Sequence, residues 1–145
     1  MIFMEYLIDG SEKVLGRLGS QAAKLLLNGH SVTVVNSENV IITGHVHDLT
    51  QKYKQRIELK DKANPEHSPY WPRRPDMFVK RVVRGMLPYK KPKGKAAFKR
   101  LRVYVGFPEE VKKAKAFEVE SKKPNQIFER TMTIKQLTQK LGYKA

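Results

Sequence analysis

The segment from residue 5 to residue 36 has the pattern strand, amphipathic helix, strand, and this order restricts the fold more than any other feature. Residues 5–9 form a short apolar run that ends in Asp-Gly, and a helix follows, with Ser11 as its expected N-cap and Gly29 as its stop. The apolar positions of this helix recur at helical spacing: Val14, Leu15, Leu18, Ala22, Leu25 and Leu26. Residues 31–36 are apolar on both alternating faces, as in a strand buried between layers. This order predicts an α/β sheet.

A further strand is predicted at residues 40–43, and its pairing is the open point of the fold. Residues 36–39 leave too short a link for an ordinary parallel crossover. The sequence therefore favours a hairpin or an offset pair at this place.

The rest of the chain predicts helices separated by irregular segments. We expect a surface helix with a basic outer side over 45–60, an irregular proline-rich loop over 61–75, and a helix over 76–87 that Pro88 ends. A cationic loop that only a partner orders is expected over 89–95, followed by a helical turn over 96–100 and a strand over 101–105. Beyond it we expect a short charged helix over 108–116, a linker over 121–125, and a docked helix capped by Thr133 and stopped by Gly142.

The stretch from Arg73 to Arg102 concentrates the positive charge. It contains twelve Lys and Arg residues and one acid, Asp76, and so carries eleven of the fifteen units of formal net charge. Clustered cations repel one another in a free protein, whereas phosphate contacts release condensed counterions. We therefore predict a nucleic-acid-binding protein. Folded RNA is favoured over duplex DNA, because no helix-turn-helix or zinc-finger pattern appears.

Within this stretch, the charge pattern alone predicts phosphate contacts from Arg73, Arg74, Lys80, Arg81, Lys99 and Arg100. Four aromatic residues lie in or beside it: Tyr70, Trp71, Tyr89 and Phe98. Each suits stacking on an unpaired base, and each equally suits a role in the core or in anchoring a loop.

Other classes of function have little support in the sequence. The absence of cysteine excludes disulfides, thiol nucleophiles and cysteine-ligated zinc. No secretory signal and no apolar run of about 18 residues appear, so we expect a cytoplasmic protein without a membrane partner. The His45 and His47 pair lacks a third ligand at metal-site spacing, since His30 and His67 are distant in sequence. We expect no metal, no cofactor and no small-molecule substrate.

One alternative from another class stays open, a nucleotide-dependent RNA-modifying enzyme that would use the strand-turn-helix opening. Its weakness is the spacing of Gly10, Gly16 and Gly19, which fits neither a dinucleotide motif nor a P-loop and favours close helix packing instead. Glu109 and Glu110 suit the first turn of a helix better than an acid/base pair. Binding to a lipid surface would require the apolar half of the helix over 76–87 to be exposed, but the chain needs that half for its core, which argues against a lipid-binding function.

Two segments closely resemble the universal large-subunit ribosomal protein thirteen family: VVRGMLPYKKPKG at 82–94 and AFKRLRVYVGFP at 97–108. Residues 6–29 and 32–44 resemble the family's N-terminal half, so the resemblance covers most of 5–108. Bacterial members carry a His-Pro-His element where this chain has FPEE at 107–110. Together with the Lys-rich loop and the C-terminal helix, this is similar to the archaeal and eukaryotic branch.

The length of 145 residues and the apolar content of 40% predict one domain over 1–145. The resemblance implies a core over about 5–108 and a C-terminal extension over about 109–145. The implied core is three-layer α/β/α around a mostly parallel, about four-stranded sheet, which overrides the expected hairpin at 36–39. The implied function is structural and non-enzymatic, with large-subunit ribosomal RNA and neighbouring ribosomal proteins as partners in the large ribosomal subunit. The family's RGMLP element faces RNA, and the resemblance therefore implies that Arg84, Gly85 and Pro88 form an RNA-facing corner. It also implies phosphate contacts from the lysines that follow: Lys90, Lys91, Lys93 and Lys95. Arg17 matches the family's Gly-Arg-Leu element, and its role stays open.

Overall fold

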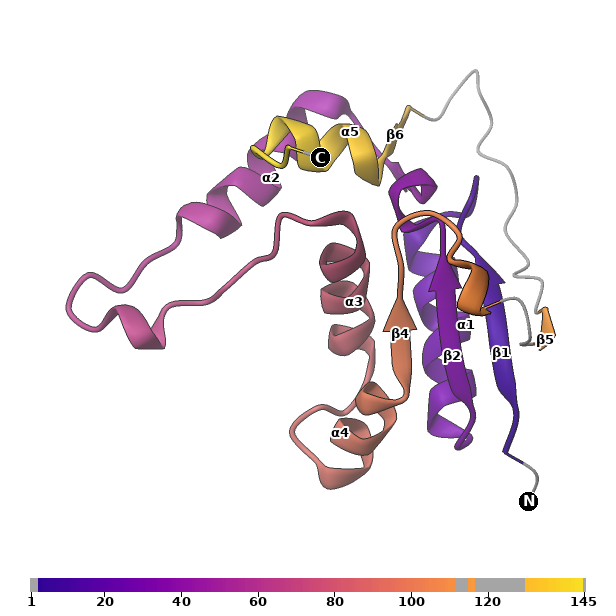
Figure 1. Cartoon of the computed structure of the whole chain (residues 1–145). Helices are drawn as coiled ribbons and strands as arrows, with labels where there is room; N and C mark the ends of the chain where they lie inside the picture. Colours follow the sequence, from indigo (N-terminus) through magenta and orange to yellow (C-terminus); the bar gives the residue numbers. More distant parts are fainter. Residues whose placement is uncertain (1–2, 112–114, 117–129, 145) are drawn as a thin grey trace.

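The centre of the molecule is a four-stranded parallel sheet with the strand order β4-β2-β1-β5 (Figure 1). The computed structural model describes residues 3–111, 115–116 and 130–144. The four strands are β1 (Glu5–Asp9), β2 (Ser31–Val35), β4 (Leu101–Val103) and β5 (Lys115–Ala116). The predicted α/β class with a mostly parallel sheet of about four strands is confirmed.

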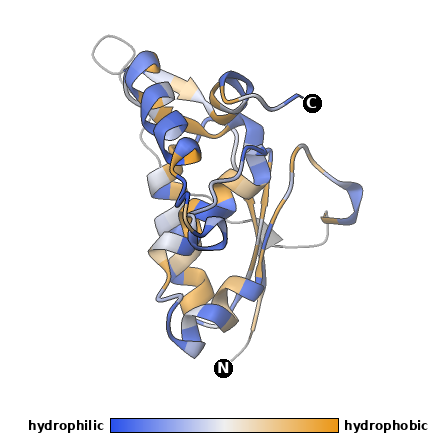
Figure 2. Cartoon of the chain, turned by 90° about the vertical axis from the view of Figure 1, so that its left-hand side faces the viewer, coloured by the Kyte–Doolittle hydropathy of each residue, from blue (hydrophilic) through white to orange (hydrophobic). Residues whose placement is uncertain are grey.

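Three helices pack on one side of this sheet, which Figure 2 shows nearly edge-on. They are α1 (Leu15–Leu27), α3 (Pro75–Met86) and α4 (Pro92–Lys99). The sheet contributes the buried residues Ile8, Val32, Val34 and Leu101 to the core, and the helices contribute Leu18, Ala22, Phe78, Val79 and Val83. Because the apolar half of α3 is part of this core, it is not available to a lipid surface.

The first helix begins later than the sequence predicts. Ser11 is not the N-cap; α1 starts at Leu15 after Val14, without a side-chain cap. The backbone before it is engaged elsewhere, because the amide of Glu12 donates to the carbonyl of Asn39 and the carbonyl of Lys13 accepts from Ile41. These tertiary hydrogen bonds outweigh a local cap, which contributes only about 1 kcal/mol. The predicted stop is confirmed, since Gly29 has a φ of 96° just beyond the helix.

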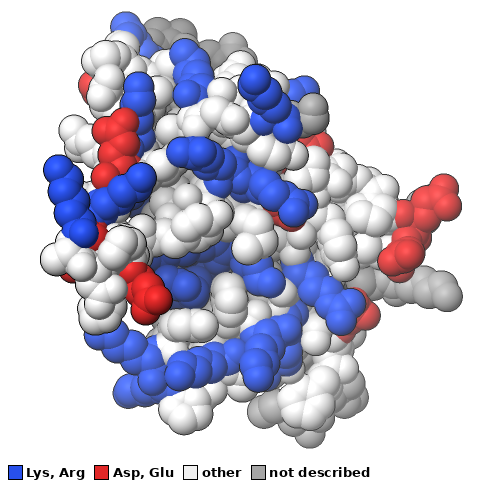
Figure 3. All heavy atoms as spheres, turned by 60° about the vertical axis from the view of Figure 1, so that its left-hand side comes forward, with Lys and Arg blue, Asp and Glu red and all other residues white. Residues whose placement is uncertain are grey.

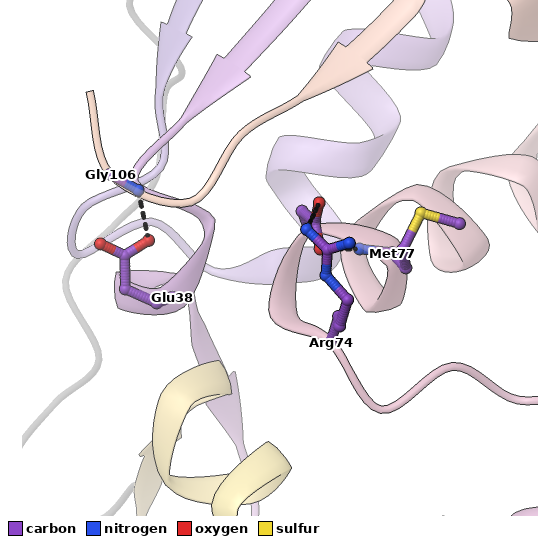
Figure 4. Close-up of polar contacts among 5 residues, drawn as sticks. Glu38, Arg74, Met77 and Gly106 are labelled. Atoms are coloured by element: carbon purple, nitrogen blue, oxygen red, sulfur yellow. Dashed lines mark hydrogen bonds and ion pairs between the residues drawn. The ribbon is translucent and has the colours of Figure 1, made fainter. Parts of the chain in front are cut away.

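The expected hairpin at 36–39 is wrong. β3 (Ile41–Thr43) leaves the sheet after the 3-10 turn η1 (Ser37–Asn39) and pairs antiparallel with β6 (Thr131–Thr133). Both edges of β2 are already occupied, by β1 and by β4, so no edge is left for β3. The chain after β4 continues along β2, and the carboxylate of Glu38 fixes it by accepting from the Gly106 amide at 3.0 Å (Figure 4).

The segment after Pro88 is not the loop that the sequence predicts, because α4 begins at Pro92 in the chain without a partner. Pro92 lies in the first turn, where its missing N–H is tolerated. Gly94 and Ala97 are buried, and Phe98 packs against the core. The spacing of 94, 97 and 98 is helical, a short apolar face hidden among lysines.

The remaining helices follow the predicted pattern with one exception. α2 (Val46–Glu58) forms the basic surface helix, and an irregular segment with the turn η2 (Pro65–His67) leads to α3. The charged helix expected over 108–116 is wrong, because the chain forms a 3-10 turn, η3 (Glu109–Val111), and then β5, which pairs with the open edge of β1. The predicted linker over 121–125 lies outside the described residues.

The C-terminal helix α5 (Ile134–Lys140) is confirmed and packs against α2, α3 and η1. Thr133 and Gln136 form a reciprocal capping box, and Gly142 ends the helix with a φ of 104°. Among the described residues, no helix has the length and apolar composition needed to cross a membrane.

A matched pair of glycine substitutions tests how tightly α4 is held. A Cβ at Gly94 would lie 2.0 Å from the carbonyl oxygen of Pro88, whereas a Cβ at Gly85 meets nothing within 4 Å. We expect Gly94→Ala to lower the free energy of unfolding by about 1–3 kcal/mol, because backbone must shift. The control Gly85→Ala should leave it unchanged or raise it by up to about 1 kcal/mol. Urea unfolding measures both; equal effects would contradict the packing described here.

Candidate nucleic-acid interface

Helix α3 presents its cations on the side opposite the core. Phe78, Val79 and Val83 are buried, while Lys80, Arg81 and Arg84 are partly exposed. This separation follows from a helical repeat of 3.6 residues, which places the apolar and basic positions on opposite halves.

Aromatic rings hold these three cations in place. The ammonium of Lys80 lies 5.2 Å from the ring centre of Phe98, and the guanidinium of Arg81 lies 5.0 Å from that of Trp71. The guanidinium of Arg84 lies 4.9 Å from the ring centre of Tyr89. Cation–π contacts contribute about 0.5–1 kcal/mol each at exposed sites. A cation–π contact uses no N–H donor in a hydrogen bond, and the described residues place no acid against these three cations, so their exposed donors can bind phosphate.

The end of α3 and the turn into α4 bring the predicted corner residues together. A hollow of about 510 Å³ is lined by Arg81, Arg84, Gly85, Leu87, Pro88, Tyr89, Lys90 and Lys91. We call Lys80, Arg81, Arg84, Gly85, Pro88, Lys90 and Lys91 the α3–α4 corner. Figure 3 shows Lys and Arg side chains gathered around a hollowed part of this face.

The other predicted cations lie outside this corner. Lys93 and Lys95 are exposed on α4, and Arg73 is exposed before α3. The guanidinium of Arg74 pairs with the carboxylate of Asp76 at 3.1 Å and is therefore partly neutralised (Figure 4).

Lys99 and Arg100 lie elsewhere, at the start of β4. They line a separate hollow with Arg102 and Glu5. Arg100 also supports the fold, because its Nη2 donates to the carbonyl of Leu26 near the end of α1 at 2.6 Å.

The four aromatic residues divide between the two roles that the sequence leaves open. Trp71 and Phe98 pack against the core, and Tyr89 makes an edge contact with Phe98 at 5.5 Å. Tyr70 is 81% exposed. Of the four, Tyr70 is therefore the residue best placed for stacking on a base.

Sequence reasoning missed one contributor, Arg56 of α2. Its guanidinium lies 4.9 Å from the ring centre of Trp71 and 5.2 Å from that of Tyr53. Burial lowers the pKa of Arg81, and the positive charges of Arg84 and Arg56 lower it further. Burial also raises the pKa of Tyr53, so this phenol stays neutral and does not compensate Arg56. The sequence signal that could have indicated Arg56 was the basic outer side of the helix over 45–60.

The remaining sequence candidates have structural roles. The ring of His45 accepts from the His47 amide at the start of α2, and His30 accepts from the amide of Met4. Within the described ranges no group of three His, Asp or Glu residues could hold a metal ion. A Cβ at Gly10 would lie 2.7 Å from Val40, and one at Gly19 would lie 2.9 Å from the sulfur of Met86. Close packing explains both glycines.

The free chain should be stabilised by salt, because Arg74–Asp76 is the one ion pair among the described residues. Raising the salt from about 0.01 M to about 0.15 M shortens the Debye length from about 30 Å to about 8 Å and screens cation repulsion. We expect the midpoint of thermal unfolding to rise over this range. The rise should be smaller for the combined variant Arg81→Gln, Lys90→Gln and Lys91→Gln than for the control Lys24→Gln, Lys135→Gln and Lys140→Gln. Equal rises would show that repulsion is not concentrated at the corner.

Comparison with known proteins identifies the family. The model of the family Ribosomal protein L13 matches residues 4–110. The chain is similar to large ribosomal subunit protein uL13 of Methanosphaera stadtmanae, with 42% identity over 97% of this chain and 99% of that protein. It is also similar to the proteins of the same name from Methanococcus maripaludis (44%; 94% and 97% of the two chains) and Methanocaldococcus jannaschii (49%; 70% and 74%). These archaeal relatives agree with the predicted branch, and the chain belongs to the ribosomal protein L13 family.

Proposed function

We propose that this protein is a structural component of the large ribosomal subunit that binds and positions folded large-subunit ribosomal RNA through the α3–α4 corner. As a member of its family, the chain is a ribosomal protein and not an enzyme. The observation that supports this RNA surface is the corner itself, where α3 and the turn into α4 carry five cations that pair with no acid among the described residues.

Charge favours a polyanion as the ligand of this corner. A solvated protein surface normally mixes positive and negative groups to avoid repulsion. Here five cations lie within the twelve residues from 80 to 91: Lys80, Arg81, Arg84, Lys90 and Lys91. Phosphates of RNA remove this repulsion, and each contact releases a condensed counterion.

Rigidity favours folded RNA over a flexible strand. The rings of Trp71, Tyr89 and Phe98 orient the three cations of α3, and the Gly94 contact fixes α4 against Pro88. A preformed cationic surface loses less conformational entropy on binding than a loop that must be ordered. Such a surface suits phosphates whose positions are already set by RNA folding.

The further RNA contacts at Arg73, Arg74, Lys93, Lys95, Lys99 and Arg100 stay predictions. Neighbouring ribosomal proteins are the other expected partners. The division of the chain into a core over about 5–108 and an extension over about 109–145 also stays a prediction.

A charge reversal tests the corner. We expect Arg84→Glu, Lys90→Glu and Lys91→Glu together to weaken binding to large-subunit ribosomal RNA fragments at least tenfold, because about three phosphate contacts become repulsive. The control reverses Lys24, Lys135 and Lys140, which are exposed on α1 and α5, and gives the same change of net charge. Filter binding measures affinity, and circular dichroism checks the fold. Equal losses in the two variants would mean that net charge, rather than the corner, determines binding.

Gly85→Ala tests whether RNA approaches the backbone of α3. The added methyl group meets no protein atom, so it should not unfold the chain. We expect it to weaken binding to the same fragments by a few-fold to tenfold, because it separates RNA from the backbone. An unchanged affinity would place the RNA backbone away from Gly85.

A further inference from the structure

A second pocket lies between α2, α3 and the segment that joins them. Its volume is about 490 Å³, and its wall includes Arg56, Tyr70, Trp71, Arg81 and Gly85. Pockets for small ligands typically measure about 300–1,000 Å³. The pocket shares Arg81 and Gly85 with the α3–α4 corner, so the two sites are contiguous.

The charges in this pocket favour an anion as its ligand. The guanidinium groups of Arg56 and Arg81 lie 4.9 Å and 5.0 Å from the centre of the same Trp71 ring. Neither group pairs with an acid in the part of the chain that the structure describes. Two guanidinium groups beside one aromatic ring combine positive charge with an aromatic surface, which suits a phosphate group and a flat ring together.

Two residues of the wall also carry buried polar atoms that the described chain leaves without a hydrogen-bond partner. Nε1 of Trp71 and Nε of Arg81 are buried, and neither has a hydrogen-bond partner among the described residues. A buried donor without a partner is unfavourable, and native proteins contain few of them. A small rearrangement around a ligand with acceptor atoms would provide partners for these donors.

Tyr70 supplies an exposed aromatic surface at the same place. Its side chain is 81% exposed and packs against no other ring among the described residues. An exposed aromatic residue beside arginines is a common platform for an unpaired base. Gly85, whose Cβ position is open, leaves the approach between the pocket and the corner unobstructed.

We propose that this pocket binds one unstacked nucleotide of RNA, with its base on Tyr70 and its phosphate between Arg56 and Arg81. The inference rests on the proposed function, because the nucleotide belongs to the RNA that the α3–α4 corner holds. An acidic peptide would match the charge but would not use the exposed ring of Tyr70.

Trp71 is the only tryptophan of the chain, so its fluorescence reports on this pocket. The full chain is titrated with short oligouridylate, with polyphosphate and with polyglutamate. We expect saturable quenching by oligouridylate at concentrations at least tenfold below those needed for the two polymers without bases. Tyr70→Ala should weaken oligouridylate binding by roughly 5-fold to 100-fold, whereas the control Tyr70→Phe, which keeps the ring, should bind like wild type.

The proposal is overturned if Tyr70→Ala binds oligouridylate as wild type does, if polyphosphate or polyglutamate binds equally well, or if Trp71 does not respond. Filter binding of ribosomal RNA fragments separates this failure from that of the proposed function. If the fragments bind wild type, bind the charge-reversal variant more weakly and leave the Trp71 fluorescence unchanged, only the nucleotide pocket is contradicted. Fragments that do not bind wild type would contradict the proposed function itself.

Discussion

The burial of one half of α3 determines the direction of the basic surface. Phe78, Val79 and Val83 are inaccessible to solvent, and burial of such side chains contributes about 1.5–3 kcal/mol each. Repulsion between partly exposed cations is weaker, about 1 kcal/mol for a pair at 4 Å in water and less with salt. Packing therefore outweighs repulsion, and the cations on the other half of α3 are held together although they repel.

The same helix links the core to both proposed RNA sites. Its end forms the α3–α4 corner, and its side toward α2 forms one wall of the pocket around Trp71. Arg81 and Gly85 line both sites, so a ligand at one site affects the charge at the other. A ribosomal protein that positions RNA needs such a fixed surface more than it needs a reactive group.

The sequence predicted those parts of the structure in which local pattern and tertiary packing agree. The apolar spacing of α1 and α3 and the predicted cap at Thr133 are present in the fold because burial and hydrogen bonding reinforce them. Prediction failed where a distant segment changes the outcome. Ser11 does not cap α1, because the backbones of its neighbours Glu12 and Lys13 form hydrogen bonds with residues 39 and 41. β3 does not pair with β2, because both edges of β2 are occupied.

The candidate site shows the same division. Lys80 and Arg81 of the corner were predicted from the local excess of charge, whereas Arg84, Gly85, Pro88, Lys90 and Lys91 were predicted from the resemblance to the family. Arg56 was not predicted as a site residue, because only the fold brings α2 beside Trp71. The helical start at Pro92 was also missed, since its lysines obscure the buried face formed by Gly94 and Ala97.

The central claim is that the basic stretch binds RNA through phosphate contacts, and the salt dependence of binding tests it most directly. The affinity of the full chain for a large-subunit ribosomal RNA fragment is measured between about 50 mM and 200 mM salt. With about six to ten phosphate contacts, the affinity should fall by about three to five orders of magnitude over this range, somewhat less for single-stranded RNA. An affinity that changes less than about tenfold would allow only one or two such contacts and would contradict the account.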